Sequence, residues 1–235
     1  MTEQEWLACT RPGPLLRFLA GTSSERKQVS ERKLRLFAVG CCRMIWHLFR
    51  DKRSRRAVQI AERFADGNAT PDTLVAARQS AQAASGLDGG AALMAAYPDA
   101  HEAAVYTGSH ALGHQFTLTS CSSSRTAWVN AEAESDKKQA TLFRCIFGNP
   151  FHPLPPKRGR KKWEEEFHTW LAWNRGRLVR LAEQIYKERA FNRLPTLADA
   201  LEESGCQEAA LLAHCRGPGP HVRGCWVVDL LLGTE

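Results

Sequence analysis

The residues best suited to bind a metal or act as a nucleophile are concentrated near the C-terminus of this 235-residue chain. If residues 221–232 form a helix, His221, Cys225 and Asp229 follow at intervals of four and share one face. Neutral imidazole and thiolate are zinc ligands, and further ligands lie shortly before this segment. Such a zinc site would draw on Cys206, His214, His221 and Cys225. The alternative is that these side chains pack in the core, because the spacing matches no standard zinc signature.

A cysteine nucleophile with His221 as its base and Asp229 as the orienting acid is a second interpretation of the same segment. Catalysis needs an exposed thiol beside its base, whereas the run CWVVDLLL around Cys225 is apolar enough to be buried. The chain also lacks the P-loop, GxGxxG and GxSxG patterns. We therefore predict no catalytic residue and expect a protein that is not an enzyme.

His110 and His114 form a second candidate metal pair, since two histidines four apart lie on the same side of a helix. No glutamate follows His110, as it would in a HExxH zinc protease. Gly113 between the two histidines also weakens a rigid ligand helix. Packing or hydrogen bonding of these histidines is the alternative to metal binding.

The third candidate is a basic segment that could bind nucleic acid. Its Arg-Gly-Arg core resembles an AT-hook, in which extended arginines enter the narrow minor groove of A·T-rich DNA. The basic residues are Lys157, Arg158, Arg160, Lys161 and Lys162. A proline usually follows the second arginine of an AT-hook, and Lys161 stands there instead. A solvated loop is the alternative, since short basic runs are common on surfaces.

Composition is that of a basic globular protein: 43% of the residues are hydrophobic and the formal net charge is +7. A basic surface permits nucleic acid, an acidic protein or an anionic membrane as partner, without selecting one. The N-terminus does not resemble a signal peptide, and no apolar run has the length of a membrane span. We therefore expect a cytoplasmic protein with reduced cysteines and no membrane association.

Helical periodicity and helix-capping residues predict an all-α fold, an array of short helix pairs followed by a C-terminal helical subdomain. The expected division is an N-terminal array over 1–149, a basic Pro-rich loop over 150–162 and the subdomain over 163–235. In the last of these, we expect an interruption at Asn174–Gly176. Periodicity alone does not separate helix from strand over 221–232, and we favour helix because no other segment would supply a partner strand.

Several segments resemble an uncharacterised, paralogue-rich bacterial protein family for which no activity is established. The similarity spans nearly the whole chain. It is carried by WLACT (6–10), KLRLFAVGCCRMIWHL (33–48), RRAVQIAERFADG (55–67), FGNPF (147–151), RAFNRLPTLADALEESGC (189–206) and HCRGPGPHVRGCWVVDLLLG (214–233). Residues 33–114 are also weakly similar to helical immunity proteins of bacterial toxin systems. Neither resemblance implies catalytic residues.

Together these observations predict a non-enzymatic helical module that binds a protein partner. DNA association through the basic segment and immunity-type binding of a toxin are the two alternatives. No cofactor is assigned from the sequence; zinc is the metal that either histidine-containing set would take.

Overall fold

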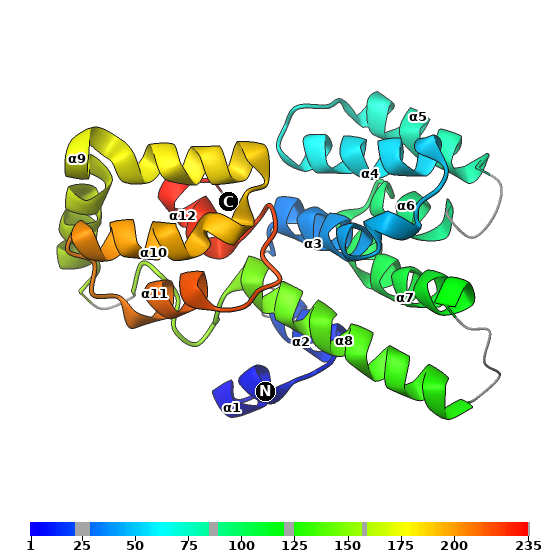
Figure 1. Ribbon diagram of the computed structural model, residues 1–235, viewed down its shortest axis with the longest axis horizontal. Coiled ribbons are helices and arrows are strands. Elements are labelled where there is room, and N and C mark those ends of the chain that lie inside the picture. The colour runs from blue at the N-terminus through cyan, green and yellow to red at the C-terminus, as the bar shows by residue number, and fades with distance from the viewer. Residues whose placement is uncertain (22–28, 85–88, 120–124, 157–158, 235) are drawn as a thin grey trace. The chain divides into compact units, whose positions relative to one another are not determined.

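The computed structural model describes residues 1–21, 29–84, 89–119, 125–156 and 159–234; the side chains of 89, 109, 112–119 and 125–128 lie outside the description. Throughout the described residues the regular structure is helical, without strands, so the predicted all-α fold is confirmed (Figure 1). The described helices include none that is long and apolar enough to cross a membrane.

The chain divides into two compact units, residues 1–143 and 144–235. The division falls inside a helix, a short distance before the proline-rich segment. Unit 1 comprises α1 (Glu3–Ala8), α2 (Pro12–Ala20), α3 (Glu31–Met44), the 3₁₀ turn η1 (Trp46–Leu48), α4 (Lys52–Ala65), α5 (Pro71–Gln82), α6 (Gly89–Ala95), α7 (Ala100–Thr119) and most of α8 (Arg125–Phe147).

Helices of unit 1 begin and end where capping residues predict. Thr70 accepts a hydrogen bond from the backbone N–H of Thr73, and Pro71 occupies the first turn of α5. Within the unit, α3 packs against α4 and α7, and α4 packs against α5. Aromatic rings join distant helices: Phe143 of α8 lies edge-on to Trp6 and Phe37.

A buried arginine connects α3 to the segment between α6 and α7. Arg35 is 2% exposed, and its guanidinium donates hydrogen bonds to the carbonyls of Ala95, Tyr97 and Pro98 at 3.3, 2.6 and 2.7 Å. Burial lowers the pKa of Arg35, although Glu31 and Asp99 act in the opposite direction. Charge-assisted bonds to three carbonyls offset the loss of hydration and fix the Pro98 bend against α3.

Unit 2 contains the end of α8, followed by α9 (Arg160–Glu188), the 3₁₀ turn η2 (Phe191–Arg193), α10 (Leu194–Glu203), α11 (Ala209–Arg216) and α12 (Trp226–Leu232). Its core gathers apolar side chains from all of these helices, including Leu178, Ile185, Leu197 and Leu211. The predicted interruption of α9 is confirmed, because Trp173–Gly176 have non-helical backbone angles and the helix turns there (Figure 1).

Two local predictions are wrong. Residues 150–162 were expected to be irregular throughout, but α9 already begins at Arg160, so Arg160, Lys161 and Lys162 are helical. Acids one turn later explain this start: Arg160 pairs with Glu164 at 2.7 Å, and Lys162 with Glu166 at 3.6 Å.

The second correction concerns the C-terminal helix, which was expected from His221 but begins at Trp226, with Cys225 as its N-cap residue. Gly219 and Gly224 have positive φ angles of 78° and 88°, a conformation that interrupts a right-handed helix. His221 therefore lies in a glycine- and proline-rich loop, and the predicted helix face shared by His221, Cys225 and Asp229 does not form.

Candidate metal centre

Four potential ligands from three parts of unit 2 meet at one point. The Sγ atoms of Cys145 and Cys225 and one ring nitrogen each of His214 and His221 all lie within 4.8 Å of one another. Sequence reasoning identified three of these residues but missed Cys145, which is separated from His221 by 76 positions. The loop that replaces the expected helix is what brings His221 to Cys145.

Cys145 is placed by the end of α8. It lies in the last helical turn, and Gly148 ends the helix with a positive φ of 68°. A Cβ at Gly148 would lie 3.4 Å from the Trp226 ring, so the helix end rests directly on the start of α12. This contact puts the Cys145 thiol beside Cys225, the residue that precedes Trp226.

The two histidines are placed on either side of a short glycine–proline loop. His214 lies in the last turn of α11, and the N–H of Gly217 donates back to the His214 carbonyl at 3.2 Å. At Gly219, a Cβ would lie only 2.9 Å from the backbone nitrogen of His221, so a glycine is needed there. The His214 and His221 rings meet edge to face, with centroids 4.9 Å apart.

Two distances within the cluster are close to those of a tetrahedral zinc site. Zinc binds sulfur at about 2.3 Å and imidazole nitrogen at about 2.0–2.1 Å, which places neighbouring ligand atoms about 3.3–3.8 Å apart. Cys145 Sγ lies 3.5 Å from His221 Nδ1, and His214 Nε2 lies 3.2 Å from Cys225 Sγ. With no pair beyond 4.8 Å, a contraction of about 1 Å of the longest separation would close the tetrahedron.

A backbone carbonyl orients the His221 ring for metal binding. His221 Nε2 lies 3.2 Å from the carbonyl oxygen of Gly217, which can only accept a hydrogen bond. Nε2 therefore carries a proton, and Nδ1 is the nitrogen that faces Cys145 and would bind a metal. Ligating histidines in metalloproteins commonly donate their other N–H to a carbonyl in this way.

Burial and electrostatics favour thiolate at one of the two cysteines. Cys225 is fully buried, and burial alone would raise its pKa; hydrogen bonds from Cys145, His214 and His221 outweigh that effect and lower it well below the ordinary value. The pKa of Cys145 is raised, first by burial and then by its hydrogen bond to Cys225. The two shifts are opposite, which favours ionisation of Cys225 before Cys145, and a bound metal would displace protons from this cluster.

The pKa of His221 is shifted by the same contact. Burial alone would lower the His221 pKa, but the hydrogen bond and charge interaction with Cys225 raise it. A bound metal ion would replace the protons of the hydrogen bonds between these sulfur and nitrogen atoms. Cys225, the candidate nucleophile, is fully buried, whereas a catalytic thiol needs to be exposed beside its base.

The remaining predicted metal ligands lie elsewhere. Cys206 is buried in the core of unit 2, next to the end of α10, and is not part of the four-residue cluster. His110 is exposed on α7, and its ring packs against Gly90: a Cβ added at Gly90 would lie 3.0 Å from His110 Nδ1. The side chain of His114 lies outside the described residues, so the pairing of these two histidines stays a prediction.

The basic segment is only partly described. Lys157 and Arg158 lie outside the described residues. Arg160 and Lys162 are exposed and form ion pairs with acids of their own helix, and Lys161 lies between them in the first turn. Arg160 begins α9, whereas an AT-hook holds Arg-Gly-Arg extended when it is bound to DNA. Binding of nucleic acid by this segment stays a prediction.

Comparison of the chain with family models, curated proteins and solved structures found no match. The chemistry of the site therefore rests on its own geometry, which is that of a Cys₂His₂ cluster able to hold a metal such as zinc.

Proposed function

We propose that this protein is a zinc-binding, non-enzymatic helical module, in which Cys145, His214, His221 and Cys225 hold one Zn²⁺ that stabilises unit 2. The observation that carries the proposal is the convergence of four ligand atoms within 4.8 Å. Two thiolates and two imidazoles are a ligand set that selects zinc over magnesium or calcium, which prefer oxygen.

The role of the metal follows from the number of its ligands. Catalytic zinc sites have three protein ligands and an open position for water or substrate, whereas structural sites have four protein ligands. Here the protein supplies all four, and both cysteines are buried. A metal at this point would join the end of α8, the end of α11 and the start of α12, and so would fix the loop that connects α11 to α12.

The broader expectations from the sequence stay predictions. A closed metal site is compatible with a module that binds a protein partner, because it leaves no coordination position for catalysis. No specific contact in the described residues favours the immunity-type role or the DNA-binding role.

Metal content and visible spectroscopy test the proposal directly. Protein purified without chelators should contain about one zinc per chain, and replacement by Co²⁺ should give the absorption of a tetrahedral thiolate site. Cys145→Ser and Cys225→Ser should each lose most of the metal.

Two buried cysteines outside the cluster provide matched controls. Cys42→Ser changes a fully buried thiol in unit 1, and Cys215→Ser changes one in the core of unit 2. Both variants should keep the metal. Wild-type protein that neither contains zinc nor gives a tetrahedral Co²⁺ spectrum would overturn the proposal, as would equal metal content in all four variants.

A further inference from the structure

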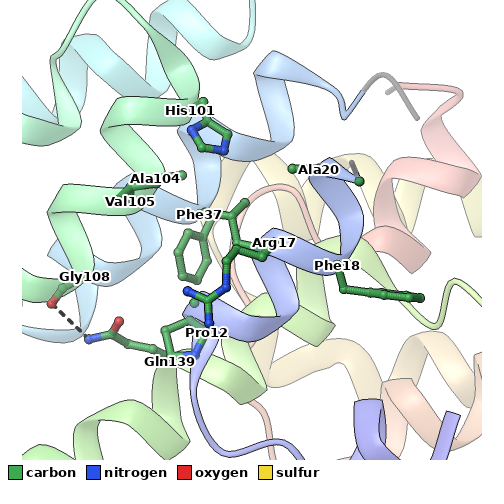
Figure 2. Close-up of a pocket in the computed structure, with 13 residues that line it drawn as sticks. Pro12, Arg17, Phe18, Ala20, Phe37, His101, Ala104, Val105, Gly108 and Gln139 are labelled. Carbon is green, nitrogen blue, oxygen red and sulfur yellow. Dashed lines mark hydrogen bonds between the residues drawn. The ribbon is translucent and has the colours of Figure 1, made fainter. Parts of the chain in front are cut away.

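A pocket of about 770 Å³ lies within unit 1, far along the chain from the metal cluster, and is lined by residues of α2, α3, α7 and α8 (Figure 2). Its wall is mainly apolar, with Leu16, Phe18, Phe37, Ala104 and Val105 among the lining residues. Pockets of about 300–1,000 Å³ with apolar walls and a few polar groups are typical of small-molecule sites. The polar groups of this pocket therefore indicate what kind of molecule would fit.

Gln139 supplies an unused hydrogen-bond acceptor in the wall. Its side chain is 1% exposed, and its Nε2 donates to the carbonyl of Gly108 at 3.2 Å and to Ser135 Oγ at 3.4 Å. The Gly108 carbonyl can only accept, so the amide orientation is determined by this contact. Gln139 Oε1 is then left buried and without a hydrogen-bond partner among the described residues.

An unsatisfied buried amide oxygen is unusual, because it loses its hydration without a replacement. The Gln139 side chain packs closely against Gly108, and a larger residue would not fit there, because a Cβ at position 108 would lie 2.5 Å from Gln139 Oε1. A ligand with an N–H or O–H group inside the pocket would satisfy this oxygen.

Arg17 supplies a positive charge at the same pocket. Its side chain is exposed, lines the pocket and makes no ion pair with a described residue. The Arg17 Nη1 atom lies 3.7 Å from the position of a Cβ at Gly13, so the guanidinium covers the first turn of α2. That turn has no side-chain cap; Pro12 and Pro14 lack an N–H, so Gly13 is the residue of the turn whose N–H can add a donor beside Arg17.

Arg17, Gln139 and the ring of Phe37 all line this pocket (Figure 2). We propose that the pocket of unit 1 binds a small, mainly apolar organic anion that bears one hydrogen-bond donor. The anionic group lies at Arg17 and the first turn of α2, the donor faces Gln139 Oε1, and the apolar body fills the space beside Phe37 and Val105. This site is independent of the metal cluster.

Two related fluorescent dyes serve as probes. Both 1-anilinonaphthalene-8-sulfonate and N-phenyl-1-naphthylamine carry apolar rings and one amine N–H, but only the first carries a sulfonate. Each should bind the intact protein with a rise in fluorescence. Arg17→Gln should weaken the sulfonate dye roughly three- to tenfold and leave the neutral dye within about twofold, because only the charge contact is lost.

Further variants separate the apolar and polar contacts. Val105→Trp should abolish the binding of both dyes by filling the pocket; Val105 is 40% exposed, so the fold tolerates the change. Gln139→Leu should weaken both dyes, since both contain the N–H. Arg56→Gln, an exposed arginine of α4 outside the pocket, is the matched control and should bind both dyes as the wild type does.

Three results would overturn the proposal: no binding of either dye to the wild-type protein, unchanged affinity of both dyes for Val105→Trp, or equal effects of Arg17→Gln and Arg56→Gln on the sulfonate dye. Arg17 and Val105 are exposed, so these outcomes do not depend on variants with a damaged core.

Discussion

Unit 1 buries the adjacent Cys41 and Cys42, and unit 2 buries four cysteines, of which Cys145 and Cys225 belong to the cysteine–histidine cluster; the surroundings of these two pairs differ. Cys41 and Cys42 of α3 are fully buried among apolar side chains, and the Cys42 thiol donates to the carbonyl of Ala91 at 3.5 Å. Burial raises the pKa of both thiols. Around Cys225 in unit 2, hydrogen bonds from another thiol and two imidazoles outweigh burial and lower its pKa. The polar neighbours of a buried cysteine therefore decide whether it is only a neutral core residue or is also suited to bind a metal.

The comparison extends to what holds each unit together. Unit 1 is held together by aromatic packing and by the buried Arg35, which donates hydrogen bonds to three backbone carbonyls. None of these contacts involves a potential metal ligand. In unit 2, the loop between α11 and α12 is connected to α8 through the cysteine–histidine cluster. The two units should therefore respond differently to metal, pH and substitution.

Removal of the metal should give the largest effect. Structural zinc contributes on the order of several kcal/mol to the fold that contains it. A strong chelator should therefore accelerate backbone hydrogen exchange in peptides from 209–233 and leave peptides from α3 and α4 unchanged. Mass spectrometry of exchanged, digested protein measures both. Equal acceleration in the two units, or none in unit 2, would contradict the proposed division of roles.

Acidification should release the metal. Zinc binding displaces the proton of Cys145, whose pKa is raised by burial and by Cys225, and the proton of His221, whose pKa is raised by Cys225 against the effect of burial. Higher pH removes these protons, so the affinity for zinc should increase as pH rises, by about tenfold per pH unit for each displaced proton. Competition with a zinc-binding dye at several pH values measures the slope, and an affinity that is independent of pH would count against these ligands.

Replacement of the buried arginine should be the most damaging change in unit 1. Arg35→Met leaves three carbonyls without their charged donor, and we expect a loss of about 2–4 kcal/mol in the free energy of unfolding. Urea denaturation with and without chelator measures it, and the loss should be the same in both. Arg56→Met, at an exposed position of α4, should change stability by less than about 0.5 kcal/mol.

A smaller effect is expected at the loop glycine. Gly219→Ala places a Cβ 2.9 Å from the nitrogen of His221 at a φ of 78°, which should shift His221 and lower zinc affinity about tenfold, equivalent to about 1.4 kcal/mol. Gly233→Ala has a similar φ of 65° but nothing within 4 Å of the new Cβ. It should therefore lose some stability and keep the zinc affinity; equal loss of affinity in both variants would assign the effect to backbone strain alone.

The smallest effect is expected at the start of α9. The Arg160–Glu164 pair is exposed, and such pairs contribute about 0.3–0.5 kcal/mol. Arg160→Gln should therefore change the unfolding free energy of unit 2 by no more than about 0.5 kcal/mol in urea denaturation. A loss above about 1 kcal/mol would show that surface charge stabilises unit 2 more than its exposure implies.

Local sequence signals predicted much of the fold. The Thr70–Pro71 start of α5, the end of α10 shortly before Gly205 and the interruption of α9 at Asn174–Gly176 all follow from capping and turn residues that act within a few positions. The sequence also singled out His214, His221 and Cys225, because histidine and cysteine are the residue types that most often bind zinc. Their common spacing on a helix was wrong, because Gly219 and Gly224 override the apolar periodicity.

The sequence by itself therefore determined the helical class and several helix ends, and it singled out three of the four residues of the cysteine–histidine cluster. Only the tertiary structure decided that Cys145 is the fourth, because the contact of Gly148 with Trp226 joins segments far apart in the chain. The pocket of unit 1 has the same origin: Arg17 and Gln139 lie 122 positions apart, and no local pattern links them. Capping and turn signals act over a few residues, whereas a binding site depends on which distant surfaces pack together.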